Sequence, residues 1–478
     1  MRSVWVRWPL APTLVFMLQA SACHVRRALP PPATADEATP GTDAAVPGDG
    51  GLLPDLTARP DLPDLAVTPD LPSQGDLSGP LDGLPAPPDL VTPGDLGTSP
   101  DLGFGCAPSG APPPTPIVPV PWFVPVRTFL VDRALGVPDS VAIGDVTGDG
   151  RNDVVVTLGS TSGSGTVEVR PQVSSGQLGT PVHYTVGPFP SKSPLAIGDL
   201  NHDGRLDVVV GQMSGIGVML QNAQGTLDPP RLYAASAPYV IAVGDFNHDG
   251  LTDVASLDWS GPAIEIHLQD PQGGLRPSVA YRVPHYGFDD LAAGDVNGDG
   301  LADLVVGDQV IGGEQGLPSF PVLLQRGDGT LASPVFYPLP AAPRGIAVGD
   351  VTGDCRGDVV ITYGGSRPGS FIASFAEDAG GGLAPAVSVA SYDMPSDVAI
   401  ADVDGDGAGD VVVLHAGGPA MLGVYRQSPG SLLAPEVLYD FGAVNAGPQK
   451  LAVGDINGDG RPDVVSGDDG GLFVLYHQ

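Results

Sequence analysis

Short hydrophobic segments flank an aspartate-rich loop, and this arrangement recurs through the C-terminal three quarters of the chain. In the first copy, the apolar run Ser140–Ile143 precedes the loop and Val154–Val156 follows it. An alternating segment comes next, clearest in Ala263–Leu268, and a Gly-x-Leu turn then leads to a fourth segment such as Pro181–Tyr184. Short apolar or alternating runs between turn residues are typical of β-strands, so each copy predicts four strands.

The repeat has a regular period and an informative end. Its loops begin at aspartates about 50 residues apart, which are Asp145, Asp199, Asp245, Asp295, Asp350, Asp402 and Asp455. Four-strand units of this length are typical of propeller blades. The last copy stops after its third strand, while a strand-like segment at residues 125–131 precedes the first copy. We therefore expect an all-β, seven-bladed β-propeller of four-stranded blades, in which this N-terminal strand closes the last blade and removes an exposed edge.

The chain begins with a segment that predicts export. Residues 1–23 have a basic start, an apolar core too short to span a bilayer, and small residues before Cys23. A cysteine after small residues resembles the bacterial lipobox, and the resemblance implies a lipidated Cys23 and an outer-membrane or cell-surface lipoprotein. The alternative is ordinary cleavage nearby and a secreted protein.

Composition separates a tether from the propeller. Residues 24–120 repeat Pro-Asp-Leu and contain almost no aromatic residues, which predicts a disordered linker. Residues 121–478 hold all seven repeats. Two further cysteines, Cys106 and Cys355, could form a disulfide between these regions or remain free thiols.

The charge of the chain limits its partners. The formal net charge is −34, with lysine only at Lys192 and Lys450. Such a surface repels nucleic acid and anionic headgroups and attracts divalent cations. We expect no nucleic-acid partner, membrane attachment through the lipid anchor only, and a monomer.

Each aspartate loop places oxygen-bearing side chains at positions 1, 3, 5 and 9, with a turn residue at position 6. Hard oxygen ligands on a flexible loop favour Ca²⁺, so up to seven calcium sites are expected; the alternative is a set of metal-free turns. Cys355 replaces the turn glycine of the fifth loop, which predicts the weakest site there. The candidate ligands are Asp145, Thr147, Asp149, Asp153; Asp199, Asn201, Asp203, Asp207; Asp245, Asn247, Asp249, Asp253; Asp295, Asn297, Asp299, Asp303; Asp350, Thr352, Asp354, Asp358; Asp402, Asp404, Asp406, Asp410; and Asp455, Asn457, Asp459, Asp463.

These repeats resemble the FG-GAP and VCBS-type units of propellers like that of the integrin α-subunit, which are common in exported bacterial proteins. The resemblance covers about three quarters of the chain and implies a calcium-binding propeller with a role at the cell surface.

The function of the face opposite the calcium loops is less constrained. Aromatic residues in its connecting segments suit sugar rings or extended peptides, and Trp259, His285, Tyr286 and Tyr392 are the candidate ligand-binding residues. The sequence holds no Gly-x-Ser-x-Gly elbow, His-Glu-x-x-His helix or phosphate loop, so no catalytic residue is assigned. We expect adhesion or binding of an extracellular glycan or protein. The alternatives are a polysaccharide lyase or hydrolase and a purely structural surface protein.

Overall fold

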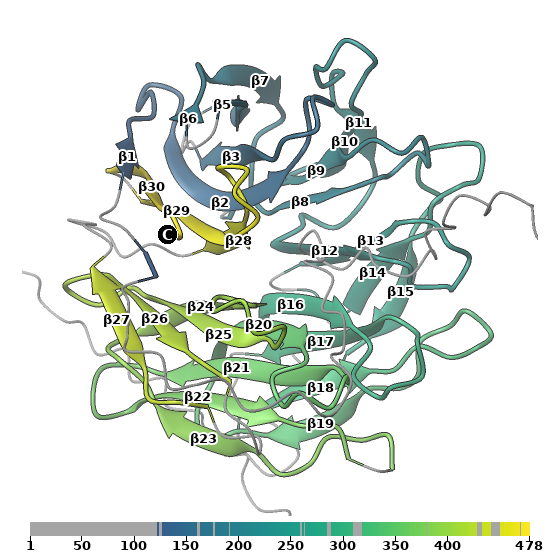
Figure 1. Cartoon of the computed structure of the whole chain (residues 1–478). Coiled ribbons are helices and arrows are strands. Elements are labelled where there is room, and N and C mark those ends of the chain that lie inside the picture. Colours follow the sequence, from purple (N-terminus) through teal and green to yellow (C-terminus); the bar gives the residue numbers. More distant parts are fainter. Residues whose placement is uncertain are drawn as a thin grey trace, which may run out of the picture. The chain divides into compact units, whose positions relative to one another are not determined.

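The computed structural model describes residues 122–123, 127–159, 163–174, 177–190, 192–258, 261, 263–283, 288–308, 318–378, 380–427, 433–440, 450–468 and 470–478. The export segment and the tether lie outside these residues and stay predictions. Seven four-stranded antiparallel sheets make up the described part, as the repeat predicts (Figure 1). Among the residues described, no helix has the length and apolar character needed to cross a membrane.

Each blade contains one repeat, read from its inner strand outward. The first three blades are β2 (Val137–Gly144), β3 (Asp153–Gly159), β4 (Gly165–Arg170) and β7 (Val182–Val186); β8 (Leu195–Gly198), β9 (Asp207–Gln212), β10 (Gly215–Met219) and β11 (Arg231–Tyr233); and β12 (Val240–Gly244), β13 (Asp253–Leu257), β14 (Ala263–His267) and β15 (Val279–Arg282). A separate two-stranded hairpin, β5 (Gln172–Ser174) and β6 (Gln177–Leu178), lies in the connection between β4 and β7.

The next three blades repeat this order. They are β16 (Phe288–Gly294), β17 (Asp303–Asp308), β18 (Ser319–Leu323) and β19 (Val335–Pro338); β20 (Pro343–Gly349), β21 (Asp358–Gly364), β22 (Ser370–Phe375) and β23 (Val387–Ala390); and β24 (Pro395–Ala401), β25 (Asp410–His415), β26 (Met421–Tyr425) and β27 (Val437–Asp440).

The seventh blade joins the two ends of the propeller. It contains β28 (Leu451–Gly454), β29 (Asp463–Asp468), β30 (Gly471–Leu475) and, outermost, β1 (Arg127–Phe129). β1 pairs antiparallel with β30, with Thr128 opposite Phe473. Because each inner strand packs against the next and β28 also packs against β2, the ring is closed. The predicted closure by an N-terminal strand is confirmed.

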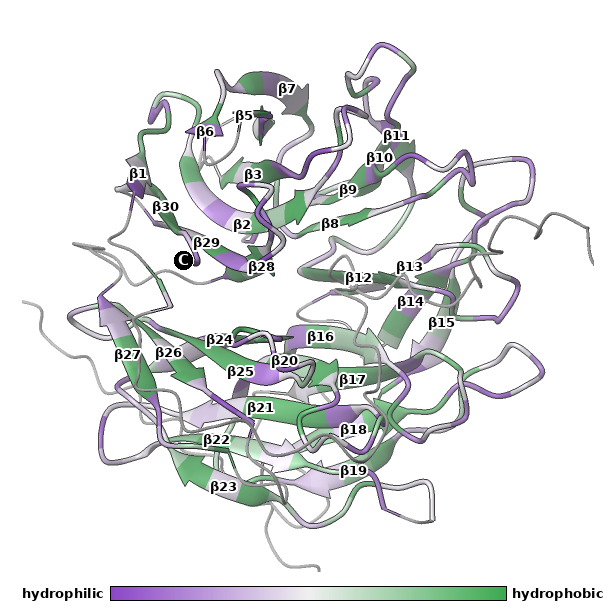
Figure 2. Cartoon of the chain, in the orientation of Figure 1, coloured by the Kyte–Doolittle hydropathy of each residue, from purple (hydrophilic) through white to green (hydrophobic). Residues whose placement is uncertain are grey.

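The core lies between neighbouring blades. The second strand of each blade is the most apolar, and Val154, Val209 and Val412 on three of these strands have no solvent-exposed surface. Figure 2 shows the hydrophobic residues concentrated along the strands. Burial on both faces explains why these strands read as continuous hydrophobic runs in the sequence.

A charged cluster joins the inner ends of three blades. Lys450, just before β28, places Nζ 2.7 Å from Asp290 Oδ1 of β16 and 3.2 Å from Asp397 Oδ1 of β24. The other oxygen of each carboxylate accepts a backbone N–H from the next blade, Ile346 for Asp290 and Leu451 for Asp397. Both carboxylates are nearly inaccessible to solvent, so the lysine compensates two buried negative charges.

Candidate functional site

The seven aspartate loops connect the first and second strands of the blades and share one backbone geometry. In the first loop, Asp145 Oδ2 accepts the N–H of Gly150 at 2.8 Å, and Asp145 Oδ1 accepts the N–H of Gly148 at 2.6 Å. The bond from position 6 to position 1 is present in all seven loops at 2.7 to 2.9 Å. The repeated aspartate therefore shapes the turn by accepting these N–H groups.

The aspartate at position 9 closes each loop from inside the propeller. These seven side chains, which begin the second strands, have at most 1% of their surface exposed. Each accepts the backbone N–H of position 2 through Oδ2, as Asp303 does from Val296 at 3.0 Å. These positions agree with the prediction that the side-chain oxygens of positions 1, 3, 5 and 9 converge on one point in each loop.

Burial raises the pKa of every closing aspartate. The pKa rises to about 6 for Asp153 and Asp358, and to about 7 for Asp207, Asp253, Asp303, Asp410 and Asp463. Backbone hydrogen bonds oppose this rise, and the other carboxylates of the loop add to it. An ionised closing aspartate is therefore unfavourable unless a cation lies nearby.

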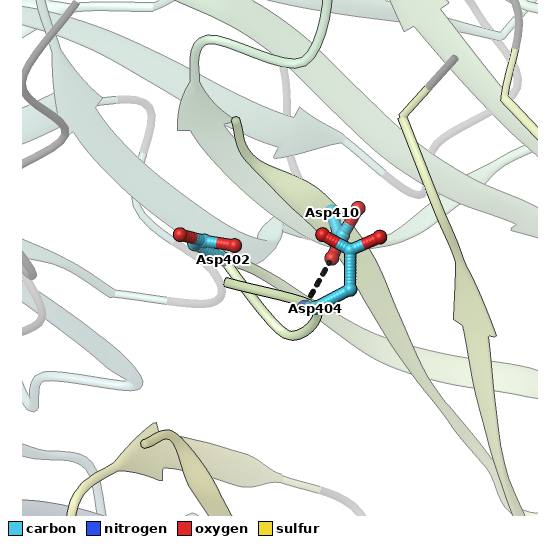
Figure 3. Close-up of side chains that lie close together, drawn as sticks. All are labelled: Asp402, Asp404 and Asp410. Carbon is cyan, nitrogen blue, oxygen red and sulfur yellow. Dashed lines mark hydrogen bonds between the residues drawn. The ribbon is translucent and has the colours of Figure 1, made fainter. Parts of the chain in front are cut away.

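The sixth loop gathers its carboxylates most closely. Asp402, Asp404 and Asp410 each offer one oxygen within 4.8 Å of the others, and among the described residues this is the acidic group that meets that distance (Figure 3). Asp404 Oδ1 is buried without a hydrogen-bond partner. The backbone N–H of Asp404 donates to Asp410 Oδ2 at 3.3 Å. These residues could hold a divalent cation, and a cation would also satisfy the unpaired oxygen.

The other loops use their side chains differently. In the third, fourth and seventh loops, the position-3 amide donates to the position-5 carboxylate, as Asn297 Nδ2 does to Asp299 Oδ2 at 3.1 Å. In the first and second loops, an arginine at position 7 pairs with the position-5 aspartate, Arg151 with Asp149 and Arg205 with Asp203. Metal binding there would require the amide oxygen to turn inward or the arginine to give way.

The fifth loop keeps its turn despite the cysteine. Cys355 has φ 66° and its N–H still donates to Asp350 Oδ2 at 2.8 Å. Cys355 is disulfide-bonded to a partner outside the described residues, so it is not a free thiol. Asp358 Oδ1 is buried and accepts no hydrogen bond from the part of the chain described. That this site is the weakest remains a prediction.

The predicted ligand-binding residues are only partly described. Trp259, His285 and Tyr286 lie outside the described residues. Tyr392 lies between the fifth and sixth blades, with the Arg367 guanidinium 3.9 Å from its ring centroid and the His415 ring edge-on at 5.5 Å. His415 Nε2 lies 2.6 Å from Glu436 Oε1, and Glu436 Oε2 accepts the N–H of Tyr392. The face of Tyr392 is therefore covered by Arg367 rather than open for stacking.

A residue that the sequence did not reveal supports the loops from a place two positions beyond the third strand. Its backbone N–H donates to Oδ1 of the closing aspartate in six blades, at 2.7 to 3.0 Å, from Gln172, Gln221, Gln269, Gln325, Gln427 and His477. The glutamine that recurs at this place in the repeat is the signal that could have identified it.

A repeat family matches part of the propeller. The profile of the FG-GAP-like repeat matches residues 145–210, 199–256, 245–306 and 402–466, and each match begins at the first aspartate of a loop. No curated protein is significantly similar in sequence. One similar solved structure is that of an Agrocybe aegerita lectin, described as the basis of specific recognition of non-reducing terminal N-acetylglucosamine. It is 17% identical, covers 64% of this chain and 80% of its own, and has a TM-score of 0.47. The chain is thus a seven-bladed β-propeller that contains FG-GAP-like repeats.

Proposed function

We propose that the propeller is a calcium-stabilised ligand-binding module. The observation that carries the calcium proposal is the sixth loop, where three carboxylates converge and Asp404 Oδ1 is buried without a partner. Carboxylate and amide oxygens are the ligands that Ca²⁺ prefers, and five of the loops supply them at positions 1, 3, 5 and 9, while the first and fifth loops have a threonine at position 3. Bound calcium would neutralise the buried closing aspartates and fix the connection between the first two strands of each blade.

Calcium removal tests this half of the proposal. At millimolar calcium and a Kd near 10⁻⁴ M, each filled site stabilises the fold by roughly 1.4 kcal/mol. Several sites together should raise the melting temperature by many degrees, and EGTA should reverse the rise. Asp404→Ala should remove one equivalent of bound calcium. Asp228→Ala, a matched loss of one exposed carboxylate outside the loops, should remove none. A melting curve that is indifferent to EGTA, in protein shown to be metal-free afterwards, would refute the proposal.

We place ligand binding on the face opposite the calcium loops. In an antiparallel four-stranded blade, the first and third connections lie on one face, so the second connection and the links between blades lie on the other. Tyr392, Arg367 and Glu436 show that aromatic and charged groups meet between two blades. A glycan or an extended peptide offers polar groups and flat apolar surfaces to such a site.

Binding and cleavage assays on neutral and acidic polysaccharides and on extracellular proteins test this second half. Binding without cleavage, weakened by Arg367→Ala, is the expected result. Cleavage would instead favour the lyase or hydrolase alternative. Absence of binding to every probe would favour a purely structural surface protein.

We propose further that a lipidated Cys23 and the Pro-Asp-Leu tether hold the propeller at the cell surface. The supporting observation is the apolar N-terminal segment that ends in small residues before Cys23. Metabolic labelling with palmitate should mark the wild-type protein and not Cys23→Ser. Equal labelling of both would contradict the lipid anchor.

A further inference from the structure

In three places a side chain from the following blade lies against the aspartate loop of the blade before it. Gln221 of the second blade donates from Nε2 to the backbone carbonyl of Asp145 in the first loop, at 3.0 Å. Gln269 of the third blade makes the same bond to the carbonyl of Asp199 in the second loop, also at 3.0 Å. In the seventh blade, His477 Nε2 lies 2.7 Å from the carbonyl of Val403 in the sixth loop. We call these side chains the clasp residues.

Each clasp residue also holds the loop of its own blade. The backbone N–H groups of Gln221, Gln269 and His477 donate to Oδ1 of the closing aspartates Asp207, Asp253 and Asp463, each at 2.7 Å. The two glutamines are at most 2% exposed. A single buried residue therefore joins a closing carboxylate of one loop to a backbone carbonyl of the preceding loop.

A second contact between the same partners comes from the Gly-x-Leu turn. The leucine of the turn forms a β-bridge with the clasp position, as Leu227 does with Gln221. The glycine of the turn closes onto position 3 of the preceding loop. A Cβ added to Gly225 would lie 2.4 Å from Thr147 O, and one added to Gly329 would lie 2.9 Å from Asn247 O. The recurrence of this turn in the sequence thus has a physical reason in the packing between blades.

The link is not present in every blade. Gln172 and Gln325 stand at the clasp position of the first and fourth blades, but their side-chain amides have no hydrogen-bond partner among the described residues. The fifth blade lacks both ends of the link. Glu377 stands at the clasp position, and an ionised carboxylate cannot donate to a carbonyl oxygen. Its Oε2 is buried and unpartnered within the described residues, while Oε1 lies 3.4 Å from Arg356 Nη1. Asp358 Oδ1, which residue 377 would hold, is unpartnered as well. Both ends of the link between the fourth and fifth loops are therefore missing.

We propose that the clasp residues couple calcium binding between the loops that they join: the first with the second, the second with the third, and the sixth with the seventh. This inference rests on the calcium binding proposed above. A filled loop holds its position-1 carbonyl and its closing carboxylate in place, so the clasp is ordered before the next loop binds. Each bound ion thereby reduces the conformational entropy that the neighbouring loop loses when it binds its own ion. Coupling therefore runs through the first three loops and between the sixth and the seventh, and a break at Glu377 separates the fourth loop from the fifth.

Hydrogen exchange measured by mass spectrometry over a calcium titration of the full chain resolves the loops separately. In the wild type, peptides that contain each loop should gain protection as calcium is added. Asp203→Ala, which removes a ligand of the second loop, should raise the calcium midpoint of the first and third loops by roughly three- to tenfold, the worth of one hydrogen bond. The fifth loop, beyond the break, should keep its midpoint.

The clasp itself is tested by Gln269→Met, which keeps the volume and removes the donor. In this background, Asp203→Ala should no longer shift the midpoint of the third loop. Gln272→Met, an exposed glutamine three residues away, should leave the shift intact.

The outcomes separate the two proposals. If no loop of the wild type gains protection with calcium, the proposed function fails. If the loops gain protection but Asp203→Ala leaves the neighbouring midpoints unchanged, only the coupling is overturned. It is overturned too if Gln269→Met lowers the melting temperature in EGTA while the shift of the third loop persists, because a purely structural residue would behave in that way.

Discussion

Replacing Lys450 by methionine should destabilise the ring more than any comparable change at the surface. The substitution keeps most of the side-chain volume but leaves Asp290 and Asp397, 2.7 and 3.2 Å from the ammonium, without a cation. Breaking a buried ion pair by removing one partner costs roughly 3–5 kcal/mol. With an unfolding entropy of about 2 cal/mol/K per residue, that loss lowers the melting temperature of a domain this size by roughly 4–7 °C. Calorimetry in saturating calcium would measure the shift.

The pH dependence of this defect follows from the same contacts. Burial raises the pKa of Asp397 to about 6, although Lys450 opposes the rise. Without the lysine this pKa must rise further, and a carboxyl whose folded-state pKa is raised loses stability as the pH increases through it. The defect of Lys450→Met should therefore be larger at pH 8 than at pH 5.

Two comparisons make this prediction decisive. Lys192→Met removes the other lysine of the chain, which lies 4.6 Å from the ring centroid of Tyr239, and should cost only about 1 kcal/mol. The triple variant Lys450→Met, Asp290→Asn, Asp397→Asn should recover much of the loss, because no charge remains buried. If Lys450→Met melts within a degree of the wild type at pH 8, the two aspartates are not the buried charges described above.

Three further predictions concern the loops. Burial raises the pKa of the closing aspartates to about 6 or 7. Between about pH 4 and pH 7 the folded metal-free chain therefore binds more protons than the unfolded chain. The melting temperature in EGTA should therefore rise as the pH falls from 8 to 5.5, and a flat profile would contradict the assigned burial. Gly225→Ala should lower the free energy of unfolding by about 1–3 kcal/mol, because φ is +74° and the new Cβ meets Thr147 O. Gly327→Ala, with open space around it, should be nearly neutral in the same denaturant titration. Under reducing conditions Cys355→Gly should be more stable than the wild type by about 1 kcal/mol, because glycine suits the left-handed backbone of this turn, and lower stability would refute that reasoning.

The fold could be predicted from the sequence because the spacing of the repeat shows where each blade begins. The aspartate motif placed the first connection of every blade, and the absence of a seventh Gly-x-Leu turn indicated that residues 125–131 complete the last blade. The structure confirms this closure through the pairing of β1 with β30. Local patterns of this kind survive in a single sequence because each blade folds mainly through contacts within itself and with its neighbours.

Contacts between blades could not be predicted in the same way. Lys450 and Asp290 are 160 residues apart, and no local pattern links them. The bond from Gln269 to Asp199 spans 70 residues and requires knowledge of which loop faces the next blade. Tyr392 is a predicted ligand-binding residue, but the position of Arg367 over its ring could not be predicted, because it depends on how two connecting segments fold against each other.

The closure of the ring by β1 also sets the order in which the molecule can be completed. β1 is synthesised before the other described strands of the propeller, yet its partner β30 is synthesised after all of them. A growing chain must therefore carry β1 unpaired while six complete blades form behind it. Contacts this distant in sequence form late, and an unpaired strand exposes hydrogen-bonding groups to other chains in the meantime. A ribosome-bound or truncated product that lacks Gly471–Leu475 would thus contain six finished blades and an open sheet edge, and it is this species that should aggregate.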